Sequence, residues 1–145
     1  MTATPRGRRP SKKMPAIQMI DTEADVLTNL AIAAEERLPQ LSELLLTEIG
    51  RATIKTAHTI APDVVTMHSR VEFRDQANGK IQTYELVFPK QADISAGRIS
   101  IMTPVGAGLI GLREGQSIVW PDRDGRERTL EVLKVTQPQQ LESLH

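Results

Sequence analysis

Residues 92–112 read ADISAGRISIMTPVGAGLIGL, and this stretch decides between two folds. It predicts a strand over residues 99–102, a Thr103-Pro104 turn, and a glycine-spaced apolar segment over residues 106–112. The last segment opens with Gly-Ala-Gly-Leu-Ile-Gly, which matches GxGxxG, the pattern of a dinucleotide-binding loop. Its surroundings decide whether that match has a chemical meaning.

The surroundings do not favour a dinucleotide site. Such a site needs a helix long enough to pack on a parallel sheet. Gly115 follows Gly111 closely, so a helix here is only about two turns long. The later strands are joined by a tight Asp-Arg-Asp-Gly turn at residues 122–125, and parallel strands cannot be joined that way. The glycines therefore indicate tight turns and close approach of backbone segments.

The sequence on both sides predicts a small antiparallel sheet. Val71 and Phe73 alternate with charged residues, which is the period of a half-buried strand. Asn78-Gly79 is a strong signal for a two-residue hairpin turn. The expected strands cover residues 70–74, 81–88, 99–102, 116–120 and 126–136.

Residues 21–58 carry a helical pattern instead, with a break at Pro39. Leu27 and Ala31 share one face of the first helix, and Leu41 and Leu45 share one face of the second. Two amphipathic helices with a short connection are expected to form an antiparallel hairpin. Each helix has about 15 residues and would be roughly 22 Å long.

These patterns predict an α+β protein, with a short antiparallel helical hairpin (coiled coil) before an antiparallel sheet domain that has one short helix. We expect four parts along the chain. They are a disordered basic tail at residues 1–16, the hairpin at 17–60, the sheet domain at 61–138 and a C-terminal tail at 139–145.

Composition excludes several classes of protein. Lys and Arg number 18 and Asp and Glu also number 18, so net charge does not favour nucleic acid as a partner of the whole chain. With no cysteine, disulfides and zinc–thiolate sites are excluded. No apolar run approaches the ~20 residues of a membrane span. The first residues lack the apolar part of a secretory signal, so we expect a cytoplasmic protein with no membrane partner.

The N-terminal tail is basic and contains no acidic residue. This composition is typical of a disordered tail. It is also typical of an arm that makes nonspecific contacts to nucleic-acid phosphates. Both interpretations remain open. The candidate contact residues are Arg6, Arg8, Arg9, Lys12 and Lys13.

Glu35, Glu36 and Arg37 mark the expected tip of the hairpin. Paired carboxylates on a projecting tip suit a divalent cation in another protein's active site. An ordinary solvated helix surface also explains them, and we favour this second interpretation.

The histidines do not indicate catalysis. His58, His68 and His145 are scattered, and no nucleophile elbow accompanies them. Nor do they share metal-ligand spacing with acidic residues. We therefore expect no catalytic residue, no metal, no cofactor and no small-molecule substrate.

The order of motifs around the opening stretch resembles the C-terminal domain of the GreA/GreB transcript-cleavage factors. The motifs are Ala-Asp-Ile, Gly-Arg-Ile-Ser, Thr-Pro and Gly-Leu-Ile-Gly, at residues 92–94, 97–100, 103–104 and 108–111. The resemblance spans about residues 62–138. Within that superfamily, residues 63–71 and 102–107 are most similar to the nucleoside diphosphate kinase regulators.

The resemblance implies an FKBP-like sheet domain and binding to RNA polymerase at the rim of its secondary channel, with the hairpin pointing inward. It implies a non-enzymatic transcription regulator that competes with longer hairpin factors. The docking residues would lie in an exposed apolar loop. They are Met102, Thr103, Pro104, Ala107 and Leu109.

Two departures from the cleavage factors argue against stimulation of RNA cleavage. The tip lacks their acidic Gly-Asp-Leu-x-Glu-Asn-type motif, and arms of roughly 22 Å are much shorter than theirs. Met102 also stands where those factors tend to have a polar or acidic residue. The alternatives are a cleavage factor that lends Glu35 and Glu36 to the polymerase, and a basic-arm nucleic-acid binder. A prolyl isomerase is disfavoured because the chain has only four aromatic residues to line a pocket.

Overall fold

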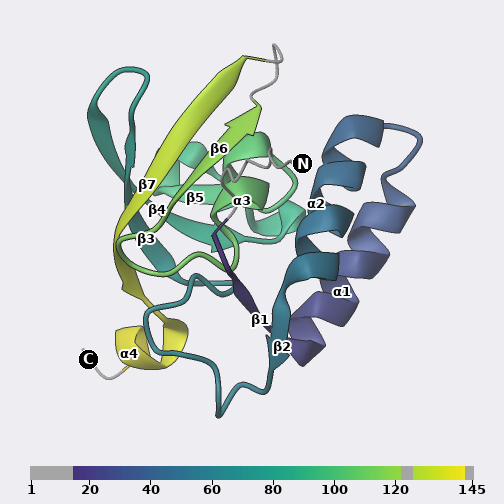
Figure 1. The fold of residues 1–145 in the computed structure, drawn as a ribbon, viewed down its shortest axis with the longest axis horizontal. Coiled ribbons are helices and arrows are strands. Elements are labelled where there is room, and N and C mark those ends of the chain that lie inside the picture. The colour runs from purple at the N-terminus through teal and green to yellow at the C-terminus, as the bar shows by residue number, and fades with distance from the viewer. Residues whose placement is uncertain (1–14, 122–125, 143–145) are drawn as a thin grey trace, which may run out of the picture.

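The computed structural model describes residues 15–121 and 126–142 (Figure 1). The five basic residues singled out in the tail, the turn expected at residues 122–125, and His145 lie outside the described residues. The described part contains helices and a mixed sheet, so the prediction of an α+β protein is confirmed.

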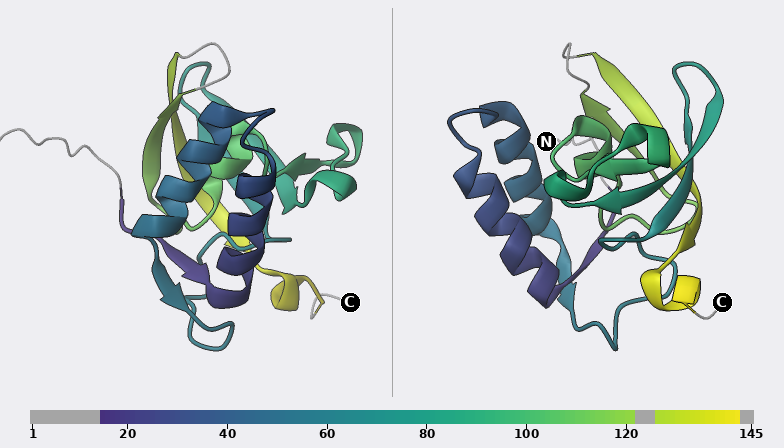
Figure 2. Two further views of the ribbon diagram at one scale, coloured as in Figure 1. Left: turned by 90° about the vertical axis from the view of Figure 1, so that its right-hand side faces the viewer. Right: turned by 180° about the vertical axis from the view of Figure 1, so that it is seen from behind.

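Two helices form one side of the molecule. α1 (Asp21–Ala33) and α2 (Pro39–Arg51) lie side by side and are joined by residues 34–38 (Figures 1 and 2). We call α1 and α2 the helix pair and residues 34–38 its tip. Each helix has 13 residues and is therefore about 20 Å long. At the end opposite the tip, β1 (Gln18–Ile20) and β2 (Thr53–Lys55) pair in parallel.

The helical segment ends earlier than the sequence pattern indicated. α2 ends at Arg51, so the expectation of helix up to about residue 58 is wrong. Gly50 has low helix propensity, and Thr53 and Ile54 are β-branched. These two residues pair with β1 instead of extending the helix. Pro39 stands in the first turn of α2, as the break in the pattern predicted.

The second half of the chain forms a five-stranded sheet in the order β5-β4-β3-β7-β6. Its strands are β3 (Arg70–Asp75), β4 (Lys80–Val87), β5 (Arg98–Ser100), β6 (Ser117–Pro121) and β7 (Glu127–Thr136). β5 runs parallel to β4, and the other neighbours are antiparallel. The prediction of a wholly antiparallel sheet is therefore wrong at this edge.

The chain between β4 and β5 explains the parallel edge. After β4 it makes two short 3-10 turns, η2 (Pro89–Gln91) and η3 (Ile94–Ala96), and returns in the same direction. The hairpin between β3 and β4 also differs from expectation. Asp75 pairs with Lys80, so four residues form the turn rather than Asn78-Gly79 alone.

Two short helices complete the described elements. α3 (Pro104–Leu109) starts two residues before the helix expected near residues 106–112, because Thr103 caps it. α4 (Pro138–Glu142) follows β7 and was not predicted. No helix in the two described ranges is long and apolar enough to cross a membrane.

One hydrophobic core joins the helix pair to the sheet. Leu27, Ala31 and Leu45 of the helix pair belong to the same buried cluster as Phe73 and Trp120 of the sheet. α3 lies between them and contacts both α2 and β6 (Figure 1). The helix pair therefore shares one core with the sheet, and α2 is the helix that packs against α3.

Candidate functional site

The turn before α3 is held by hydrogen bonds from two side chains. The Thr103 hydroxyl donates to the carbonyl of Ser100 at 2.7 Å and accepts from the N–H of Gly106 at 3.1 Å. The N–H of Met102 donates to Oγ of Ser100 at 2.9 Å. Because Pro104 has no N–H and a fixed φ, it suits the first position of α3. The turn is therefore fixed to β5 at one end and to α3 at the other.

This turn presents only part of the expected docking loop. Met102, Thr103, Pro104 and Val105 are half-buried and so reach the surface. Ala107 and Leu109 are 0% and 1% exposed, so the expectation that they lie in an exposed loop is wrong. They occupy the inner side of α3, which packs against α2 and β6.

The glycines of the GxGxxG match allow close backbone approach. A Cβ at residue 106 would stand 2.2 Å from the carbonyl oxygen of Ser100, and one at residue 108 would stand 3.1 Å from the Trp120 ring. Gly111 has φ +87° and lies against Gln18 of β1. The interpretation of these glycines as turn and contact positions is confirmed.

The tip of the helix pair is polar at its centre and apolar at its edges. Glu35, Glu36 and Arg37 are exposed there. Ile32 and Leu38 flank them and are 53% and 36% exposed. No group of three acidic or histidine side chains that could hold a metal ion occurs among the described residues.

The histidines and serine near residue 68 form no catalytic arrangement. Ser69 is buried, and its hydroxyl bonds to Thr66 at 2.7 Å. His68 has φ 68° and turns toward Glu85, with 3.9 Å between Nδ1 and the carboxylate, and toward the edge of Phe88. His58 is exposed nearer the start of the same connection between β2 and β3. The structure does not bring His58 and His68 together.

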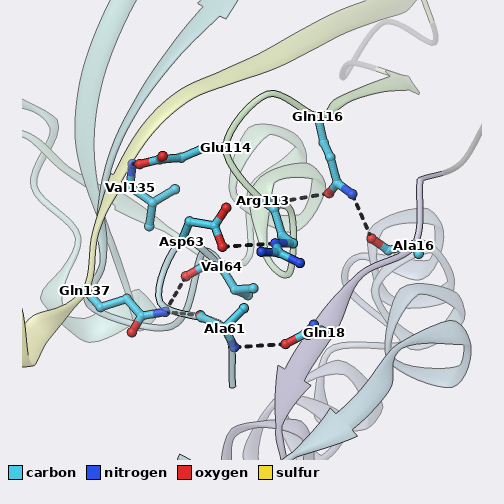
Figure 3. A network of polar contacts seen from close by, with 10 residues as sticks. All are labelled: Ala16, Gln18, Ala61, Asp63, Val64, Arg113, Glu114, Gln116, Val135 and Gln137. Carbon is cyan, nitrogen blue, oxygen red and sulfur yellow. Dashed lines mark hydrogen bonds and ion pairs between the residues drawn. The ribbon is translucent and has the colours of Figure 1, made fainter. Parts of the chain in front are cut away.

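Five polar side chains clamp the base of the helix pair to the sheet domain (Figure 3). One ion pair connects the loop after β2 to the loop after α3. Asp63 accepts from Nε of Arg113 at 2.9 Å. Gln116 accepts from the N–H of Arg113 and donates to the carbonyl of Ala16. These contacts fix the chain just before β1 against the loop after α3.

The other two residues of this clamp bind the same loop from opposite sides. Gln18 of β1 accepts from the N–H of Ala61 at 3.0 Å. Gln137, which is 2% exposed, donates to the carbonyls of Ala61 and Val64. Sequence reasoning missed this clamp, because single glutamines form no sequence pattern and most of their partners are backbone atoms distant in the sequence.

Glu23 forms a second connection between the helix pair and the sheet domain. Its carboxylate accepts from the N–H of Met67 at 3.0 Å. Burial raises the pKa of Glu23, and the hydrogen bond from Met67 offsets part of that rise. The ionised form of Glu23 is therefore less favourable in the folded protein than in the unfolded chain.

The raised pKa predicts a specific pH dependence. The folded state holds the Glu23 proton more tightly than the unfolded state, so this group stabilises the fold most below its unfolded pKa. Its contribution falls as pH rises through the folded pKa. Glu23→Gln should therefore raise the free energy of unfolding slightly at neutral pH and remove this decline, as urea unfolding at several pH values would show. The exposed Glu43→Gln variant should retain the decline, and a decline that persists in Glu23→Gln would contradict the assignment.

The second half of the chain matches a known family. The model described as "Transcription elongation factor, GreA/GreB, C-term" matches residues 60–137, which is more than half of the chain. The chain belongs to the GreA/GreB family. The match covers α3, the five-stranded sheet and the turn at residues 102–104, which we call the braced turn, and it excludes the helix pair.

Curated GreA/GreB relatives carry two kinds of name. The regulator of nucleoside diphosphate kinase from Escherichia coli (strain K12) is 40% identical over 95 residues, which cover 66% of this chain and 70% of that protein. The transcription elongation factor GreA from Acidiphilium cryptum is 35% identical over 101 residues, covering 70% and 61% of the two chains. Both names describe regulators or transcription factors.

A solved GreA/GreB structure extends the likeness beyond the sheet domain. The prokaryotic transcription elongation factor GreA/GreB from Nitrosomonas europaea superposes with a TM-score of 0.66 at 33% identity. The match covers 86% of this chain and 100% of that one, so it includes residues before position 60.

Proposed function

We propose that this GreA/GreB family protein is a regulator of transcription elongation that binds RNA polymerase at the rim of its secondary channel. The turn at Met102, Thr103 and Pro104 would make the contact, and the helix pair would enter the channel mouth. Family membership supports the link to transcription elongation. A cytoplasmic location and the absence of an enzymatic activity belong to the same proposal.

The braced turn is the observation that carries this proposal. It lies inside the region that matches the family, and its hydroxyl contacts hold Met102 and Pro104 at the surface in one arrangement. A rigid loop with apolar side chains binds a partner without a large loss of conformational entropy. Ala107 and Leu109 support the turn from the core and are no longer part of the proposed contact.

The helix pair supports blocking of the channel rather than transcript cleavage. Its helices are only about 20 Å long, and α2 is packed against α3 of the sheet domain. We infer that it is a shortened counterpart of the coiled coil of the cleavage factors, and that the sheet with α3 is FKBP-like. In this arrangement Glu35 and Glu36 would reach the channel mouth and not the catalytic metal.

A pull-down with core RNA polymerase tests whether the braced turn makes the contact. Pro104→Asp should weaken binding by about tenfold or more, because it places a charge in an apolar contact. The variant should fold, since Asp is favourable in the first turn of a helix. Gln82→Asp on the exposed first half of β4 adds the same charge away from the turn and should bind normally. Equal binding by the two variants would overturn the proposal.

A backtracked elongation complex tests the alternative of transcript cleavage. We expect no shortening of the RNA when the protein is added, because its tip carboxylates would not reach the catalytic metal. The measurement is RNA length over time on a denaturing gel. Rapid shortening that is lost with Glu35→Ala would instead assign Glu35 and Glu36 to metal binding in the polymerase site.

A further inference from the structure

The chain is neutral, but its charge is divided sharply among three parts. Residues 1–14 carry five basic residues and no acidic one, for a net charge of +5. Residues 21–51, the helix pair with its tip, carry seven acidic and two basic residues, for a net charge of −5. The remaining residues are balanced, with eleven of each sign. The N-terminal segment and the helix pair are therefore electrostatic complements.

Most of the acidic residues of the helix pair form no ion pair with another described residue. Glu48 is buried and pairs with Arg51, and Glu23 accepts the N–H of Met67. The other five carboxylates are exposed, and none forms an ion pair within residues 15–121 and 126–142. They belong to Asp21, Asp25, Glu35, Glu36 and Glu43.

An open groove of about 490 Å³ runs along the outer face of α2, beginning at the tip. Pro39, Leu46 and Thr47 line it together with two of the exposed carboxylates, those of Glu35 and Glu43. An apolar floor with carboxylates at its edges suits an extended segment that carries both apolar and cationic side chains. Residues 1–14 contain Pro5 and Pro10 between their basic residues, which is such a composition.

The described chain begins beside α2. The Arg51 guanidinium, at the last residue of α2, donates to the carbonyl of Pro15 and is itself held by Glu48. Fourteen residues can span up to roughly 46 Å, which is more than twice the ~20 Å length of α2. The segment before residue 15 can therefore reach every part of the groove.

We propose that residues 1–14 dock intramolecularly in the groove of α2, with their basic side chains paired to the exposed carboxylates of the helix pair. Each exposed ion pair contributes little, about 0–1 kcal/mol. The tether raises the effective concentration of the segment to the millimolar range, so contacts worth about 4 kcal/mol are enough, and the ion pairs supply them together with the apolar floor of the groove. Docking is therefore expected to be strong at low ionic strength and to be lost as salt screens the charges.

A docked segment would cover the tip side of the helix pair, where Glu35 lies. If the helix pair enters a polymerase channel, the segment must leave the groove first, and docking then acts as an autoinhibitory contact. This consequence rests on the proposed function. The intramolecular docking does not depend on the proposed function, and its test uses the isolated full-length protein.

The absence of cysteine allows a spin label at a single introduced site. Ser11→Cys carries a nitroxide, and the amide signals of the labelled protein are recorded by NMR. We expect selective broadening of the amide signals of Glu43 and Thr47, which line the groove. The signals of Gln82 and Thr83, in the exposed first half of β4, should broaden little. The broadening should be strong at about 0.01 M salt and disappear at about 1 M, where the Debye length falls to ~3 Å.

Charge variants of the labelled protein identify the contact. Lys12→Gln with Lys13→Gln, or Glu43→Lys alone, should reduce the broadening severalfold, whereas Lys90→Gln on the sheet domain should not change it. Equal broadening of the signals of β4 and α2, or broadening that does not change with salt concentration, would overturn the proposal. A segment that leaves α2 unbroadened and binds single-stranded DNA would show that its partner is nucleic acid instead.

Discussion

Gly106→Ala is expected to unfold the protein or to lower its free energy of unfolding by ~3 kcal/mol or more. The added Cβ would stand 2.2 Å from the carbonyl oxygen of Ser100 and 3.0 Å from Cα of Ile101. Both are backbone atoms at the end of β5, and the N–H of Ile101 donates to Val87 of β4. Relief of the clash must therefore move a strand or α3. Urea unfolding followed by circular dichroism would measure the loss.

Gly50→Ala provides the matched control for this prediction. A Cβ at residue 50 would meet nothing within 4 Å beyond its chain neighbours and the nearby backbone of α2 itself, and the residue is exposed. The same substitution should therefore stabilise the protein by up to about 0.5–1 kcal/mol. If both variants lost stability equally, the clash at Ser100 would not be the cause. A stable Gly106→Ala protein would contradict the close approach of α3 to the backbone of Ser100 and Ile101.

Much of the sheet could be predicted from the sequence because its signals are local. The alternation of Val71 and Phe73 with charged residues places one face of β3 in the core, and both side chains are buried. Pro39 fixed the start of α2 by its ring geometry. The order of motifs from residue 92 to residue 111 also sufficed to identify the family that the sequence model matches.

The features that escaped prediction depend on contacts between distant residues. Nothing local shows that Thr53 will pair in parallel with Gln18, or that β5 will return parallel to β4. Ala107 and Leu109 looked like an exposed apolar loop because the sequence does not show that α2 covers α3. Gln137 contributes through two backbone carbonyls about seventy residues away. The structural roles of such residues are known only once the structure shows that their side chains are buried.

Thr103→Val is expected to affect both the stability of the braced turn and the proposed binding to RNA polymerase. The hydroxyl of Thr103 both donates to the carbonyl of Ser100 and accepts the N–H of Gly106. Valine has nearly the same shape but can form neither bond, so the cap of α3 is lost. We expect the free energy of unfolding to fall by about 2 kcal/mol, the upper range for an N-cap. Urea unfolding measures this effect without any partner.

The same variant should also weaken binding to core RNA polymerase, because Met102 and Pro104 lose the brace that fixes them before contact. A loss of about tenfold is expected, which corresponds to ~1.4 kcal/mol. Thr103→Ser retains the hydroxyl and should restore both stability and binding. If Thr103→Val lost stability but bound normally, the turn would be a structural cap and the docking surface would lie elsewhere. Loss of both, with rescue of both by serine, is the outcome that the braced turn requires.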